Sequence, residues 1–112
     1  MSEADALLRH HWSAYFAGAR ALSRSTTAVC EIARRCRLRG RSLDRLEARL
    51  SVLAQAVAGL HAAAAAETER LAAGTTEEGR RQLQLWATSE GEQVAAALTA
   101  AERKWRKIKL RS

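Results

Sequence analysis

A regular pattern of apolar residues runs through the middle of the chain, from Leu43 to Leu71. These positions alternate by three and four residues, which is the heptad spacing of a helix that packs against other helices. They are Leu43, Leu46, Leu50, Leu53, Val57, Leu60, Ala64, Glu67 and Leu71, of which Glu67 alone is charged. The pattern predicts a helix over residues 42–73 whose apolar stripe lies against helices of this chain or of a partner.

A second seam with the same spacing precedes it. It consists of Leu8, Trp12, Tyr15, Ala19, Leu22, Thr26, Val29, Ala33 and Cys36. Ser2 is a candidate N-cap, and Glu3 and Asp5 in the first turn suit the helix dipole. A run of arginines followed by Gly40 is typical of a helix C-terminus. These features predict a helix over residues 4–37, with Ser42 as the cap of the helix that follows.

A third helix is predicted over residues 76–110, with Thr75 or Thr76 as its cap. Its seam is less regular and drifts toward an eleven-residue period. The seam consists of Leu83, Trp86, Glu90, Val94, Ala97, Ala101, Trp105 and Ile108. Residues 88–93 are polar and include Gly91, where a helix can bend, but we expect one helix.

Three helices with two short turns predict an all-α fold in which residues 1–112 form a single bundle of antiparallel helices, up-down-up. Matching heights along the rod puts Trp12 and Trp86 in one layer, and Trp105 level with Ala33 and Leu50. Large side chains then face small ones, which favours an intramolecular bundle. The same seams also suit a coiled coil with other chains, and that alternative stays open. The predicted core is Trp12, Tyr15, Leu22, Val29, Leu46, Leu50, Leu53, Val57, Leu60, Trp86, Val94 and Trp105.

Composition supports this fold and bears on the compartment. The chain has 112 residues and no proline, which suits one helical domain. Cys30 and Cys36 are six residues apart on one predicted helix, about 9 Å along its axis. That is too far for a disulfide, so we expect a reducing compartment, the cytoplasm, with the nucleus as the alternative.

Targeting segments are not expected. No run of 18 apolar residues marks a transmembrane segment, and no secretory signal begins the chain. Residues 6–30 lack acids and contain arginines and serines, as mitochondrial presequences do, but the first helical seam runs straight through them.

Charge is the strongest functional signal. The net charge is +7, from 19 Lys and Arg against 12 Asp and Glu. In an up-down-up bundle the first and third helices end at the same pole, where 11 basic residues would converge. These are Arg34, Arg35, Arg37, Arg39, Arg41, Arg103, Lys104, Arg106, Lys107, Lys109 and Arg111. Helix dipoles account for one or two charges per end, so this basic pole indicates an acidic partner, nucleic acid or anionic lipid. The alternative is a basic end that is solvated and binds no partner.

Catalytic, metal and cofactor sites are not indicated. His10 and His11 point about 100° apart on a helix, so they do not share a metal. Cys36 lies on the seam and is interpreted as a core residue, while Cys30 has no histidine at helical spacing to activate it. No phosphate loop or nucleophile motif occurs. We therefore expect no enzyme and no cofactor.

In length, in its three long heptad helices and in the tryptophans on its first and third helices, the chain resembles a single spectrin-type repeat. It is also similar to the small helical subunits of lysosome-positioning and organelle-biogenesis complexes. These resemblances are architectural and assign no functional residue. They imply a helical adaptor or complex subunit in a cytoskeletal or membrane-trafficking assembly, which binds other helical proteins. The alternatives are a nucleic-acid-associated factor and a binder of anionic membrane surfaces, both acting through the basic pole.

Overall fold

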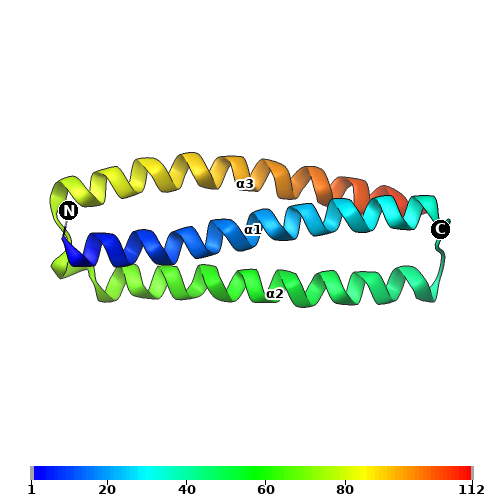
Figure 1. Ribbon diagram of the computed structural model, residues 1–112, viewed down its shortest axis with the longest axis horizontal. Coiled ribbons are helices and arrows are strands. Elements are labelled where there is room, and N and C mark those ends of the chain that lie inside the picture. Colours follow the sequence, from blue (N-terminus) through cyan, green and yellow to red (C-terminus); the bar gives the residue numbers. More distant parts are fainter. Residues whose placement is uncertain (1, 112) are drawn as a thin grey trace.

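The computed structural model describes residues 2–111, which form three long helices in an up-down-up bundle (Figure 1). Helix α1 spans Glu3–Arg35, α2 spans Arg41–Arg70 and α3 spans Glu77–Arg111; a 3₁₀ turn, η1, spans Ala72–Gly74. The molecule is a rod of 53 × 20 × 16 Å. The predicted all-helical bundle is confirmed.

The two helix starts at one end of the rod are capped by hydroxyl side chains. The Ser2 Oγ accepts the Asp5 N–H at 3.1 Å, and the Asp5 carboxylate accepts the Ser2 N–H at 3.0 Å, which forms a capping box. The Thr76 hydroxyl accepts the Gly79 N–H at 2.9 Å, so Thr76 caps α3. Helix α3 continues through residues 88–93 without a break, as expected.

The connection between α1 and α2 differs from the prediction. Helix α1 ends at Arg35, because Arg37 adopts a φ of 50° that no helix continues through. Gly40, with a φ of 55°, directly precedes α2. Ser42 therefore lies inside α2, and its predicted capping role is wrong. Helix α2 also ends earlier than expected, at Arg70.

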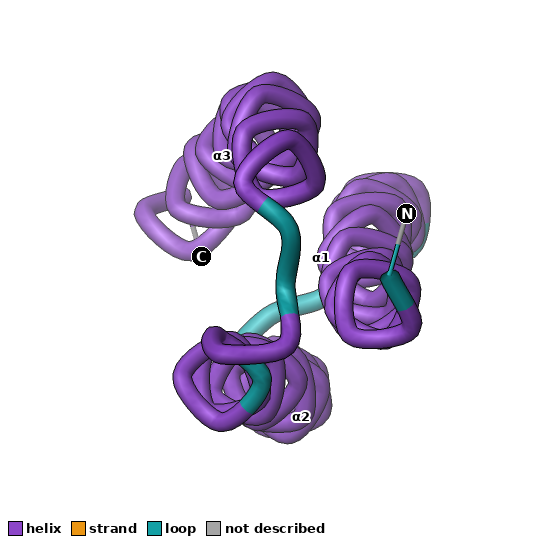
Figure 2. Tube along the Cα trace, turned by 90° about the vertical axis from the view of Figure 1, so that its left-hand side faces the viewer, coloured by secondary structure: helices purple, strands orange, loops and turns teal. Residues whose placement is uncertain are grey.

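Helix α1 packs along both α2 and α3, whereas α2 and α3 make few close backbone approaches to each other (Figure 2). The core forms two clusters. In one, Phe16 packs with Ala19 and Val94, with Trp12 and Trp86 around it. In the other, Trp105 packs with Cys30, Ala33, Leu43 and Leu50. These are the two tryptophan layers that height matching predicts.

The predicted core residues differ in how deeply they lie. Leu50, Val94 and Trp105 are buried. Most of the others are half-buried: Trp12, Tyr15, Leu22, Val29, Leu46, Val57 and Trp86. The prediction is wrong for Leu53 and Leu60, which are 43% and 38% exposed. A heptad pattern drifts about 20° per repeat around a straight helix, and these two leucines lie at the edge of the buried stripe.

Two further core assignments need correction. Cys36, which the seam placed in the core, is exposed, because α1 ends one residue before it, whereas Cys30 is buried. Burial raises the pKa of the Cys30 thiol. Phe16, which the seam missed by one position, is only 3% exposed and is a central core side chain.

Candidate interaction surfaces

One end of the rod holds most of the positive charge. The C-terminal turns of α1 and α3 meet the first turns of α2 there (Figure 1). We define the basic end as residues 30–50 and 98–111. It contains 13 of the 19 basic residues and 4 of the 12 acidic ones, a net charge of +9, while the rest of the chain carries −2. The positive net charge of the molecule therefore comes from this end alone.

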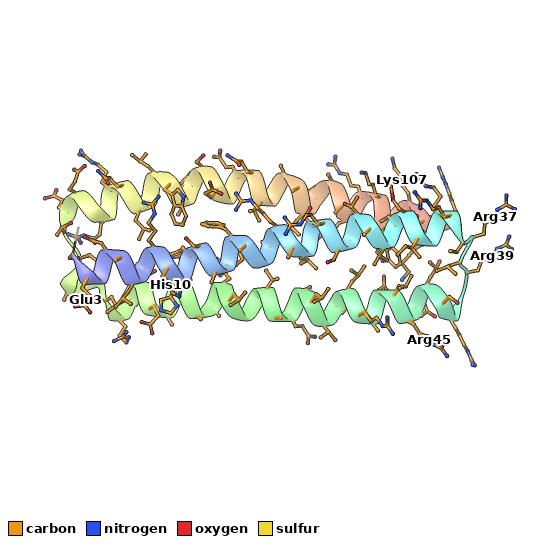
Figure 3. The ribbon with its side chains drawn as sticks, in the orientation of Figure 1. Glu3, His10, Arg37, Arg39, Arg45 and Lys107 are labelled. Atoms are coloured by element: carbon orange, nitrogen blue, oxygen red, sulfur yellow. The ribbon has the colours of Figure 1, made fainter. Side chains whose placement is uncertain are left out.

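The 11 predicted basic residues all belong to this end, and Figure 3 shows several of them pointing outward. Ten are exposed: Arg34, Arg35, Arg37, Arg39, Arg41, Arg103, Lys104, Arg106, Lys107 and Arg111. Lys109 is half-buried. The prediction missed Arg45 and Arg49, which are also exposed. Their four-residue spacing from Arg41 places all three along one side of α2 and was a readable signal.

A hydrogen-bonded contact ties α3 to α2 beneath the basic end. The Trp105 Nε1–H donates to Glu47 at 3.0 Å, and the Lys109 ammonium donates to the same carboxylate at 2.6 Å. The bond from Lys109, and then that from Trp105, holds the pKa of Glu47 below its ordinary value. Trp105 is 8% exposed, so its ring belongs to the core and is closed to base stacking.

The opposite end collects the acids Glu3, Asp5, Glu67, Glu69, Glu77 and Glu78. Asp5 is 5% exposed and accepts hydrogen bonds from the Ser2 N–H and the Thr76 hydroxyl, both at 3.0 Å. The backbone bond from Ser2 is the main reason that the pKa of Asp5 is lowered. These bonds join the starts of α1 and α3, which gives the acidic end a structural role.

Between α2 and α3, near the basic end, lies an open groove of about 440 Å³. Its lining includes Leu22 and Thr26 from α1, Leu50 and Ala54 from α2, and Leu98 from α3. The groove exists because the two helices converge on α1 rather than on each other.

Helix α2 leaves much of its apolar surface uncovered. Residues 50–66 contain no charged side chain, yet only Leu50 and Ala64 are buried among them. Val52 is 65% exposed. By length and composition alone, α2 is long and apolar enough to cross a membrane, although no transmembrane segment was predicted; core helices of soluble proteins also meet that criterion.

Two further polar side chains, His61 and Glu90, have partners within the bundle. His61 packs edge-on against the rings of Trp12 and Tyr15, with centroids 5.3 and 4.9 Å away. Glu90 forms an ion pair with Arg20 between α3 and α1. Within residues 2–111, no group of three or more His, Cys, Asp or Glu side chains is placed to hold a metal ion.

Comparison with protein-family models, curated proteins and solved structures finds no match.

Proposed function

We propose that the protein is a non-enzymatic interaction subunit, a helical rod whose basic end binds an acidic surface of a partner protein. The observation that carries this proposal is the segregation of charge, with +9 on the basic end and −2 on the rest. Ten guanidinium groups lie within that end, and the planar guanidinium suits bidentate pairing with carboxylates. We propose an assembly of the cytoskeletal or membrane-trafficking type, as the resemblance to spectrin-type repeats implies.

An acidic protein fits this end better than a nucleic acid does. Ile32 and Leu110 are 51% and 81% exposed among the basic side chains, and apolar contacts of that kind are typical of protein interfaces. The one aromatic side chain in the basic end is Trp105, which is buried. Binding of single-stranded nucleic acid relies on exposed aromatic rings for stacking. Duplex phosphates could still pair with the arginines, which makes a duplex the competing ligand.

The test compares three labelled ligands at about 0.15 M salt, near physiological ionic strength. They are a Glu-rich helical peptide, a random-sequence DNA duplex and vesicles that contain phosphatidylserine. We expect the peptide to bind more tightly than the duplex or the vesicles, as measured by fluorescence anisotropy and co-sedimentation. Tighter binding of the duplex would replace this proposal with the nucleic-acid function, and tighter binding of vesicles would replace it with the membrane function.

A charge-reversed variant localises the contact. Changing Arg39, Arg103 and Lys107 to Glu should weaken peptide binding at least about tenfold, since like charges then face the ligand. The matched control changes Arg24, Arg80 and Arg81, which are exposed outside the basic end, to Glu and alters net charge equally. Equal losses in both variants would mean that only the overall charge matters, which contradicts a site at the basic end.

A further inference from the structure

A second heptad seam runs along α2, beside its buried stripe. Leu53, Ala56, Leu60 and Ala63 follow one another by three, four and three residues, and all four are exposed. They lie to one side of the buried positions of the same helix. This spacing is the one that lets a helix pack continuously against another helix. Helix α1 approaches Leu60 at Gly18, but Leu53 and Leu60 stay 43% and 38% exposed.

The seam ends in opposite charges. Arg49 lies four residues before Leu53, and Glu67 lies four residues after Ala63. Within the monomer, Glu67 also forms an ion pair with Arg70 of the same helix. Arg49 and Glu67 are 18 residues apart, which is about five full helical turns, so they lie on the same side of α2 as the seam. When two such strips pack antiparallel, the cation of each lies opposite the anion of the other.

We propose that a second copy of the chain covers this seam, with the two α2 helices antiparallel about a two-fold axis at the level of residue 58. Leu53 then faces Ala63 of the second copy, and Leu60 faces its Ala56. Arg49 faces Glu67 of the second copy, and the symmetry repeats each pair. One register therefore matches large side chains with small ones and cations with anions at every level of the seam.

The charge distribution selects the antiparallel arrangement. Parallel helices would place Arg49 against Arg49 and would bring two basic ends together, each with a net charge of +9. Like charges in contact are destabilising. In the antiparallel pair the two basic ends lie at opposite ends of the dimer, so both stay free for other partners.

The neighbouring surface of α1 leaves room for this pairing. Leu60 lies over Gly18, where an added Cβ would come within 2.9 Å of the Leu60 Cδ1. Ala14 and Ala21, one turn to either side of Gly18 on α1, are exposed and small. A second helix can therefore approach the seam without meeting a bulky side chain from α1 beside Leu60.

The test is sedimentation equilibrium over a wide concentration range, with register-specific variants of the full chain. Wild type should dimerise. Arg49→Glu and Glu67→Arg should each raise the dissociation constant about tenfold or more, because each creates two like-charge pairs. The double variant Arg49→Glu/Glu67→Arg should restore dimerisation, since the pairs re-form with reversed sign. Arg103→Glu on α3 is the matched control and should leave the dissociation constant unchanged.

Circular dichroism melts test whether each variant still folds. Leu53→Asp is a further variant of the seam: because Leu53 is exposed, the change should abolish the dimer without unfolding the monomer. If the wild type stays monomeric at every concentration, the proposal is overturned. This holds equally if the monomer binds lipid vesicles, since lipid and not a second copy would then cover the seam. A dimer that the single variants leave intact, or that the double variant fails to restore, would overturn it by showing that another surface or register is used.

Discussion

At the scale of single residues, Gly59 and Gly79 both lie inside helices, but in opposite surroundings. A Cβ added at Gly59 would meet no other atom within 4 Å. A Cβ added at Gly79 would overlap the Asp5 carboxylate, which is held by Ser2 and Thr76. Since glycine disfavours helix relative to alanine wherever space is available, the first site is free to accept a methyl group and the second is not.

The same substitution should therefore have opposite effects. Gly59→Ala should raise the free energy of unfolding by up to about 1 kcal/mol through helix propensity. Gly79→Ala should lower it by about 1 kcal/mol or more, because overpacking displaces a hydrogen-bonded side chain. Urea titration followed by circular dichroism measures both, at low protein concentration so that the values refer to the monomer. Changes of the same sign would contradict the packing described around Gly79.

At the scale of helices, Glu47 joins α2 to α3 and makes this pairing sensitive to acid. Because Lys109 and Trp105 lower the pKa of Glu47, its ionised form stabilises the fold at pH values above its ordinary pKa of 4.5. This stabilisation is lost as the pH falls through the lowered pKa, since a protonated carboxyl accepts these bonds poorly. Asp5, whose pKa is also lowered, adds an acid-sensitive contact at the other end.

We expect Glu47→Gln to lower the free energy of unfolding at neutral pH. The further decrease of that free energy between neutral and acidic pH should then be smaller in the variant than in the wild type. Urea titrations at several pH values give the comparison. The control is Glu69→Gln, an exposed glutamate on the same helix, which should leave the pH profile close to that of the wild type. A Glu47→Gln profile parallel to the wild-type profile would show that the pairing contributes nothing to the pH dependence.

The helices and their layers were predictable because heptad spacing and caps are local signals. Ser2 and Thr76 cap their helices, and Trp105 lies level with Ala33 and Leu50, as the spacing indicates. Burial at the edges was not predictable in this way. Leu53 and Leu60 belong to the seam by spacing, but burial also needs a bulky neighbour on that side, and α1 meets Leu60 at Gly18, which has no side chain.

The wrong prediction for Cys36 has a different cause. It depends on where α1 ends, and the positive φ of Arg37 has no glycine or proline to mark it. Phe16 was missed because a helix that packs against two neighbours buries a stripe wider than a heptad seam, which includes the position next to Tyr15.

At the scale of the whole molecule, the charge poles followed from the topology alone. Once three helices of similar length alternate in direction, the ends of α1 and α3 must meet, and the basic residues of both gather there. The uncovered seam did not follow, because the sequence cannot show which face of α2 its own neighbours leave free. The order and direction of the helices are enough to predict which helix ends meet. Which face of α2 stays exposed depends in addition on how each helix is rotated about its axis.

The basic end carries a net charge of +9, and repulsion between its basic side chains destabilises the folded protein. At low salt, repulsion between these side chains favours the unfolded chain, where they are farther apart. Raising the ionic strength from about 0.01 to 0.15 M shortens the screening length from about 30 to 8 Å. We therefore expect the melting temperature to rise by several degrees over that range, measured by circular dichroism.

Salt has the opposite effect on the ion pairs of the bundle, because screening weakens attraction and lowers the melting temperature. Lys109–Glu47 and Arg20–Glu90 are attractive and partly exposed, so salt should weaken them, but exposed pairs contribute little each. Repulsion should win because the basic end holds 13 cations against 4 anions. The variant with Arg39, Arg103 and Lys107 changed to Glu should then show a smaller salt effect and a higher melting temperature at low salt. A wild-type melting temperature that falls as salt is added would mean that the attractive pairs outweigh the repulsion, and that the basic end is neutralised within the fold instead of being left for a partner.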